Sequence, residues 1–260
     1  MLWRTKGDFM NSHVCRMHWA HRGRALTGLS LAIVVAIAGM AAGCSSSNRE
    51  TVSGPARFHS PAPFGGQLPV PEATLSAEDR AWEVYQASKA ADWEAAALCY
   101  GALTADVRHI PQTADNGELL AELDTTLRDL HDAIHVRDVV SAMNHANNAT
   151  ALTAQLAAPY RTDVPTEARM MAFYARRLEI FVMSGNVGQL RETAVRMGAL
   201  WQRLRPLVTA RGATSLAEEF GVTVAKTINA QQVSDFVPLV APAQQQVDQI
   251  DLLFRTTDEE

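Results

Sequence analysis

The sequence is poor in cysteine and in lysine. Its 260 residues include three cysteines, Cys15, Cys44 and Cys99, and the first two precede residue 45. We therefore expect Cys99 to be an unpaired, buried thiol without an internal disulfide, so that the fold is stabilised by apolar burial. Beyond residue 43 the only lysines are Lys89 and Lys226, and arginine and alanine are abundant instead.

Motifs that carry catalysis are also missing. The chain has no Gly-x-Ser-x-Gly elbow, no phosphate-binding Gly-rich loop, no paired-cysteine motif and no c-type haem attachment site. Residues 44–260 carry 18 basic and 27 acidic side chains, a net charge of −9. Such an acidic chain repels phosphate backbones. We therefore expect neither an enzyme nor a protein that binds nucleic acid.

The most informative stretch lies between residues 22 and 44. It consists of a basic pair, an apolar run with three interruptions, and four small residues: Arg22 and Arg24, Leu26 to Met40 with Gly28, Ser30 and Gly39, and Ala41-Ala42-Gly43-Cys44. The run is shorter than the roughly 20 clean apolar residues that a membrane-spanning helix prefers. This order of basic, apolar and small residues is typical of a secretory signal.

The last four residues of this stretch resemble the lipobox of bacterial lipoproteins, with Ala41 where Leu is usual. The resemblance covers only the leader. It implies cleavage before Cys44 and a diacylglycerol thioether on its sulfur. Two or three acyl chains, at about 0.8 kcal/mol per buried CH2, make a stable anchor. We expect residues 1–43 to be a signal peptide, whose start is Met1, Met10 or Met17. An uncleaved signal anchor is the alternative.

The leader predicts an extracytoplasmic protein of the cell envelope, held in a membrane by its N-terminal lipid. Ser45, which follows the acylated cysteine, resembles the pattern of lipoproteins sorted to the outer membrane of diderm cells. In a monoderm cell the same chain lies on the outer face of the plasma membrane. Residues 44–75, rich in Pro, Gly and Ser, are expected to be the acylated cysteine and a disordered tether.

Residues 76–260 are expected to form one helical domain, because no segment alternates with period two. The connections between the helices are short, which predicts an all-α antiparallel bundle of about seven to eight helices behind the tether. Pro238 and Pro242 are expected to break the last helix near its start. Capping and breaking residues place the helices at 77–90, 92–107, 118–134, 137–158, 166–184, 187–204, 215–228 and 233–254.

A polar edge follows the apolar stripe of the third expected helix at the same spacing. Its members are Asp124, Arg128, His131, His135 and Asp138. If that helix continues past residue 134, His131 and His135 at i, i+4 can jointly hold Cu, Zn or Fe, with Asp124, Asp138 or His145 as a further ligand. The alternative is a solvated boundary stripe with ion pairs at helical spacing.

Two further polar groups fall on expected helices. Asn147 lies on an apolar face, so we expect a buried amide with a partner on another helix, a ligand pocket being the alternative. Arg169, Arg176, Arg177 and Glu179 are expected to form a solvated face with helical ion pairs, an anion site being the alternative.

These patterns lead to two hypotheses of function. The first is a lipid-anchored envelope protein whose bundle binds another envelope component, such as a partner protein, and catalyses nothing. An exposed aromatic groove at Trp82, Trp93 or Trp201 would favour it. The second is an envelope protein that handles a transition metal through the histidine edge. Convergence of these side chains within coordination distance would favour it, and no other cofactor is expected.

Overall fold

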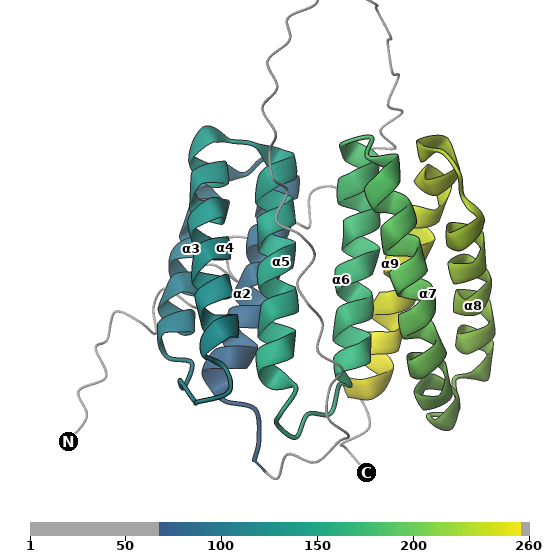
Figure 1. Cartoon of the computed structure of the whole chain (residues 1–260), viewed down its shortest axis with the longest axis horizontal. Coiled ribbons are helices and arrows are strands. Elements are labelled where there is room, and N and C mark those ends of the chain that lie inside the picture. Colours follow the sequence, from purple (N-terminus) through teal and green to yellow (C-terminus); the bar gives the residue numbers. More distant parts are fainter. Residues whose placement is uncertain (1–67, 256–260) are drawn as a thin grey trace, which may run out of the picture.

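The computed structural model describes residues 68–255, which form eight α-helices and no named β-strand (Figure 1). The all-α helical bundle predicted from the sequence is therefore confirmed. The expected signal peptide, Cys44 and most of the expected tether lie outside the described residues. In chain order the helices are α2 (Glu72–Lys89), α3 (Trp93–Arg108), α4 (Gly117–Val136), α5 (Val139–Ala157), α6 (Thr166–Met183), α7 (Val187–Ala210), α8 (Thr214–Asn229) and α9 (Val233–Arg255).

The eight helices are arranged as two four-helix units that lie side by side in Figure 1. In the first unit α2 packs against α3 and α5, and α4 packs against α5. In the second unit α6 packs against α7 and α9, and α8 packs against both of these. The units meet where α5 packs against α6. Consecutive helices run antiparallel, as their short connections require.

The second unit repeats the first at the level of helix positions. Helices α6, α7 and α9 each begin 94 residues after α2, α3 and α5, and α8 begins 97 residues after α4. The turns repeat as well. Ala91 and Gly185, 94 residues apart, both have a left-handed backbone, with φ of 52° and 67°. Asp92 and Asn186 follow them, and each side chain accepts a hydrogen bond from the backbone N–H three residues later, at 3.2 and 3.1 Å. Each turn thus ends one helix and caps the next.

The central helix α5 explains how the two units share one core. It contains no Asp, Glu, Lys or Arg, and α2, α4 and α6 surround it. A helix without a charged face is suited to burial on all sides. Met143 and Leu152 of α5 and Phe173 and Leu178 of α6 are fully buried in this core.

Several expected boundaries are wrong. Helix α2 begins at Glu72, four residues before the expected domain start at Ser76, and Pro71 takes the N-cap position. Helix α5 begins at Val139, because Arg137 has a left-handed backbone that ends α4. Helix α9 is continuous through Pro238 and Pro242. Both rings lie on its exposed side, where carbonyls that lose their helical partner face water.

The expectation for Cys99 is also wrong. The side chain is buried in α3, as expected, but its sulfur is disulfide-bonded. The partner lies outside the described residues.

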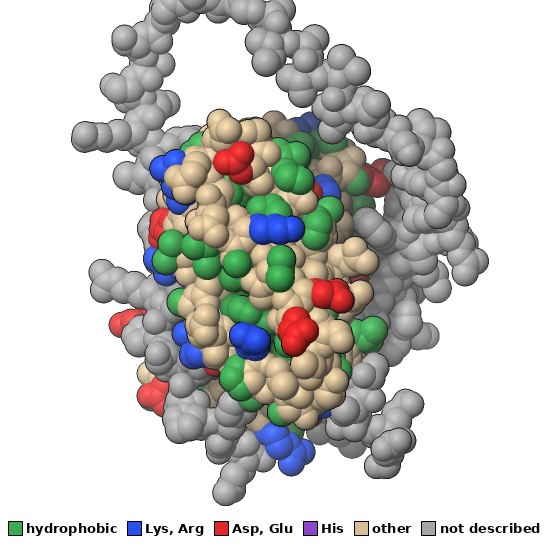
Figure 2. Space-filling view, turned by 90° about the vertical axis from the view of Figure 1, so that its right-hand side faces the viewer, with side chains coloured by type: hydrophobic (Ala, Val, Ile, Leu, Met, Phe, Trp, Pro, Cys, Tyr) green, Lys and Arg blue, Asp and Glu red, His purple; other side chains and the backbone are tan. Residues whose placement is uncertain are grey.

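Figure 2 shows the α7–α8 side of the molecule, where apolar side chains are interspersed with charged ones. Val195 of α7 and Val222 of α8 are each more than half exposed. No helix within residues 68–255 has a stretch long and apolar enough to cross a membrane.

Candidate functional site

The two histidines predicted as metal ligands lie next to each other on the exposed side of α4. The ring centres of His131 and His135 are 6.4 Å apart, and the two ring planes are nearly parallel, at 7°. Nδ1 of His131 lies 3.4 Å from a carboxylate oxygen of Asp132. One helical turn separates the two residues, and this spacing brings their side chains onto one face.

The other three predicted ligands do not join this pair. Asp124 forms an ion pair with Arg128 at 3.4 Å on exposed α4. Asp138 is the N-cap of α5, where its carboxylate accepts hydrogen bonds from the backbone N–H and the hydroxyl of Ser141. Burial opposes the charged form of this carboxyl, but the bonds from Ser141 outweigh burial and lower its pKa.

His145 lies on α5, half-buried, and burial lowers the pKa of its imidazole. The expected edge is broken because α4 ends at Val136, so that Asp138 belongs to the next helix. Among the described residues, no three His, Cys, Asp or Glu side chains form a group that could hold a metal ion. The predicted convergence of ligands is therefore absent from this part of the chain.

The histidine pair instead borders an open pocket between α3 and α4. The pocket has a volume of about 370 Å³. The residues from α3 are Trp93, Glu94, Ala97 and Tyr100, and those from α4 and its end are His131, Ile134, His135 and Arg137. The ring centres of Tyr100 and His131 are 5.6 Å apart. Burial, together with the carboxylates of Asp124 and Asp132, raises the pKa of Tyr100, so its hydroxyl remains a hydrogen-bond donor at neutral pH.

The equivalent helix pair of the second unit is packed more tightly. Eight residues connect α3 to α4, but only three connect α7 to α8, and α7 and α8 pack more closely than α3 and α4. Ile228 on α8 lies 97 residues after His131, the same offset as the starts of the two helices. Its side chain packs against Gly198 of α7, where an added Cβ would lie 2.7 Å from Cδ1 of Ile228. The fold therefore does not require an open pocket at this position.

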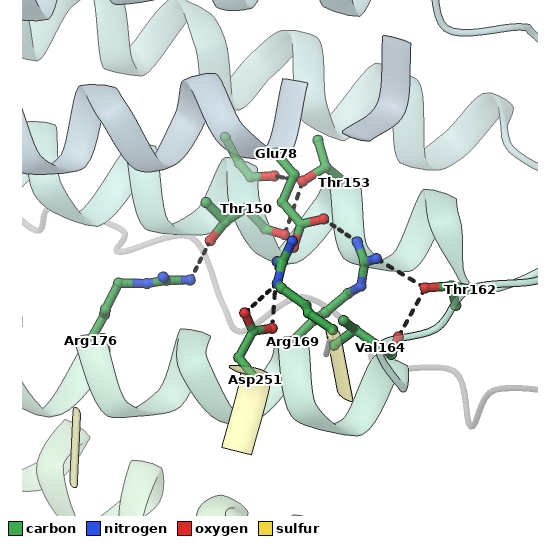
Figure 3. A network of polar contacts seen from close by, with 10 residues as sticks. Glu78, Thr150, Thr153, Thr162, Val164, Arg169, Arg176 and Asp251 are labelled. Atoms are coloured by element: carbon green, nitrogen blue, oxygen red, sulfur yellow. Dashed lines mark hydrogen bonds and ion pairs between the residues drawn. The ribbon is translucent and has the colours of Figure 1, made fainter. Parts of the chain in front are cut away.

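A second polar group, which we call the junction network, lies where the two units meet (Figure 3). Arg169 of α6 forms an ion pair with Glu78 of α2 and donates a hydrogen bond of 3.0 Å to Thr162. Burial raises the pKa of Glu78 in spite of the neighbouring Arg169. Thr162 in turn donates to the carbonyl of Val164 in the α5–α6 connection.

Arg176 of α6 completes this junction. Its guanidinium donates hydrogen bonds to Asn147, at 2.7 Å, and to Thr150, at 3.0 Å. It also lies 5.0 Å from the ring centre of Trp82 and 5.9 Å from that of Tyr85, both on α2. Burial lowers the pKa of Arg176, although the group stays protonated at neutral pH.

The carboxylate of Glu179 links three helices of the two units. It accepts hydrogen bonds from the hydroxyl of Tyr85, at 2.6 Å, and from Gln244, at 2.9 Å, and it pairs with Lys89 at 2.6 Å. Arg177, on another side of α6, is buried against the rings of Phe173 and Phe181. The predicted solvated arginine face is therefore wrong, because α6 is covered by α5, α7 and α9.

The junction network and the pocket between α3 and α4 differ in whether their side chains are available to a ligand. Most polar groups of the junction network are paired with one another, although the buried Nε of Arg169 makes no hydrogen bond in the described chain, so this network mainly holds the units together. The pocket between α3 and α4 presents rings and charges to solvent. Within residues 68–255, histidine rings hydrogen-bond only to the Ala105 carbonyl and the Asp132 carboxylate, so the described part shows no pair of a histidine base and a nucleophile. The pocket is therefore suited to binding a ligand. The sequence pattern singled out His131 and His135 on α4, but it did not indicate that Trp93 and Tyr100 of α3 lie beside them.

No protein-family model, curated protein or solved structure matches this chain at a significant level.

Proposed function

We propose that this chain is a lipid-anchored protein of the cell envelope whose helical body acts as a non-catalytic binding domain. The single observation that supports a binding role is the open pocket between α3 and α4, with its aromatic, imidazole and charged side chains. The lipobox-like residues 41–44 support the anchor. Acylation of Cys44 and removal of residues 1–43 would leave Cys99 without a second free cysteine in the same chain, so the proposal requires that the disulfide of Cys99 in the full chain is absent from the mature protein. The ligand belongs to the envelope, either as a small molecule or as an exposed group of a partner protein.

The anchor is tested by growing cells that express the full chain with an alkyne-tagged fatty acid. We expect the tag on the wild-type protein, which sediments with membranes, and no tag on the Cys44→Ser variant. A tagged Cys44→Ser variant, or an untagged wild-type protein, would reject lipidation at this residue.

The binding role is tested with a pair of variants on exposed alanines. Ala97→Leu fills the floor of the pocket, whereas Ala121→Leu adds the same side chain to α4 outside it. A panel of amino acids, amines, organic acids, sugars and Cu, Zn and Fe ions is screened by NMR of the Trp93 indole N–H. We expect at least one compound to shift this resonance in wild type and Ala121→Leu but not in Ala97→Leu. Equal responses in all three proteins would reject the pocket as the binding site.

Metal handling is the second candidate, and the near-parallel rings of His131 and His135 are the observation that favours it. Two imidazoles at i, i+4 can chelate a transition metal, with the remaining ligands from solvent. Titration with Cu, Zn and Fe should then show stoichiometric binding that is lost in the His131→Ala/His135→Ala double variant. Binding that is unchanged in the double variant would exclude this pair as the metal site.

A further inference from the structure

Four ring systems surround the pocket between α3 and α4. Trp93 and Tyr100 contribute theirs from α3, and His131 and His135 contribute imidazoles from α4. Tyr100, His131 and His135 follow one another with ring centres 5.6 and 6.4 Å apart, so the rings form a continuous wall. The faces of tryptophan and tyrosine rings attract cations, and groups of such rings recognise methylated ammonium ions.

The floor of this ring of aromatic side chains is small and apolar. Ala97, one turn after Trp93 and almost one turn before Tyr100, leaves the space between these two rings free. Ile134, which also lines the pocket, is buried. The volume of about 370 Å³ lies within the range of sites for small ligands. An apolar floor favours methyl groups over a hydrated primary ammonium.

Two opposite charges lie at one end of the pocket. Glu94 is at the start of α3, and Arg137 ends the antiparallel α4. Both are exposed, and within the described chain neither side chain takes part in a hydrogen bond or an ion pair. The Glu94 carboxylate complements a cation held among the rings. The Arg137 guanidinium suits a carboxylate or phosphate, which it can bind through two parallel N–H groups.

The geometry points to a zwitterionic ligand, with a methylated ammonium group among the four rings and an acidic group on Arg137. This inference rests on the proposed binding function and names the class of ligand for the same pocket. Glycine betaine and the phosphocholine headgroup share this chemistry, the first as a free solute and the second as part of a lipid. The more tightly packed α7–α8 pair has Ile228 in place of His131 and Ala194 in place of Tyr100, so it lacks the corresponding rings.

The test is calorimetric titration of the whole mature chain with four probes. Glycine betaine and phosphocholine carry both charges, choline carries only the cation, and 3,3-dimethyl-1-butanol has the shape of choline without charge. We expect choline to bind about tenfold more tightly than the neutral alcohol. One or both zwitterions should bind more tightly than choline. Tighter binding of glycine betaine would indicate a free solute as the ligand, and tighter binding of phosphocholine would indicate a lipid headgroup.

Variants separate the two halves of the site. Arg137→Gln should reduce the affinity for the zwitterions to that for choline, and leave choline unchanged. The exposed Arg205→Gln on α7 is the matched control and should change neither. Tyr100→Leu and Ala97→Leu should weaken the binding of choline and of both zwitterions. A thermal melt of each variant shows whether the fold is retained.

Three results would overturn the inference. If the neutral alcohol binds as tightly as choline, the pocket recognises shape rather than charge. If none of the four probes binds, while another compound or a metal ion shifts the Trp93 resonance and Ala97→Leu abolishes that shift, the ligand class is wrong although the binding role holds. A pocket that responds to no compound at all would overturn the inference and the binding role together.

Discussion

The buried amide of Asn147 on α5 accepts a hydrogen bond of 2.7 Å from Nε of Arg176 on α6. The same side chain donates a hydrogen bond of 3.0 Å to the carbonyl of Phe173. It therefore satisfies a charged group and a backbone group of the neighbouring unit at once. The arginine also lies against Trp82 and Tyr85 of α2, so this one amide helps to position three helices.

Replacing Asn147 with alanine should destabilise the protein by about 2–4 kcal/mol. The substitution leaves two buried groups without their partner, and each such loss costs roughly 1–3 kcal/mol. Urea unfolding followed by circular dichroism measures the effect. The neighbouring Asn148, which is less buried and makes no side-chain hydrogen bond in the described chain, is the control. Asn148→Ala should change stability by less than about 0.5 kcal/mol. Equal effects of the two substitutions would contradict the role of this amide.

The repeated turns predict opposite effects of two reciprocal substitutions. Ala91 and Gly185 occupy equivalent left-handed positions, at φ of 52° and 67°. A side chain with Cβ is strained in this region by roughly 1–2 kcal/mol, and glycine is not. Ala91→Gly should therefore stabilise the protein by about 0.5–1 kcal/mol, because added chain entropy in the unfolded state offsets part of the gain. Gly185→Ala should destabilise it by about 1 kcal/mol.

The same unfolding experiment measures both turn variants. Ser184→Ala, adjacent to Gly185 but with an ordinary right-handed backbone, is the control and should change stability little. Two substitutions with the same sign would show that the turns are not equivalent.

Local patterns in the sequence account for the helices and for much of their burial. The predicted apolar stripe consists of Leu120, Leu123, Leu127, Leu130 and Ile134. The last four are buried, as the spacing predicts, and Leu120 is half-buried. Asn147 is fully buried with a partner on α6, which confirms the prediction made from its place on an apolar face. These features depend on residues within one helix, so periodicity is sufficient to find them.

Contacts between distant helices could not be predicted in the same way. Arg169 and Glu78 are 91 residues apart, and no local spacing indicates that they pair. One feature of the sequence does indicate that α5 is the central helix: it carries no Asp, Glu, Lys or Arg, which is typical of a helix surrounded by others. The pocket required the register of α3 against α4, which depends on the eight-residue connection between them.

Two glycines within helices should respond differently to alanine. Gly101 of α3 is exposed and has no atom within 4 Å of an added Cβ, so Gly101→Ala should stabilise the protein by about 0.5–1 kcal/mol. Gly198→Ala on α7 brings the same gain in helix propensity, but the added Cβ would lie 2.7 Å from Cδ1 of Ile228. The side chain of Ile228 must then rotate, so we expect Gly198→Ala to be less favourable than Gly101→Ala by about 1 kcal/mol.

A double-mutant cycle shows whether this contact is the cause. Ile228→Val removes the Cδ1 atom that meets the new methyl group. In the Ile228→Val background, Gly198→Ala should recover the stabilisation seen for Gly101→Ala. Additive effects of the two changes would mean that Gly198 is not limited by Ile228.

The three hydrogen bonds to Glu179 predict a stability difference that depends on pH. Burial alone would raise the pKa of this carboxyl, but the bonds from Lys89, Tyr85 and Gln244 outweigh burial and hold the pKa below its ordinary value of 4.5. A group with a lowered folded-state pKa stabilises the protein above its unfolded-state pKa, and this contribution is lost as pH falls through the folded-state pKa. Glu179→Gln should therefore destabilise the protein by about 1.5–3 kcal/mol at neutral pH, and the difference from wild type should shrink below pH about 4.5.

Urea unfolding at a series of pH values from about 3 to about 7 measures this difference, because an ordinary glutamate gains its proton within that range. Glu192→Gln, which removes a partly exposed carboxylate paired with Arg196 on the same helix, is the matched control. Its effect should stay within about 0.5 kcal/mol at every pH, because such pairs on a helix surface contribute little. A penalty for Glu179→Gln that persists unchanged at the lowest pH would mean that Lys89, Tyr85 and Gln244 require two accepting oxygens, which an amide cannot supply, rather than the negative charge.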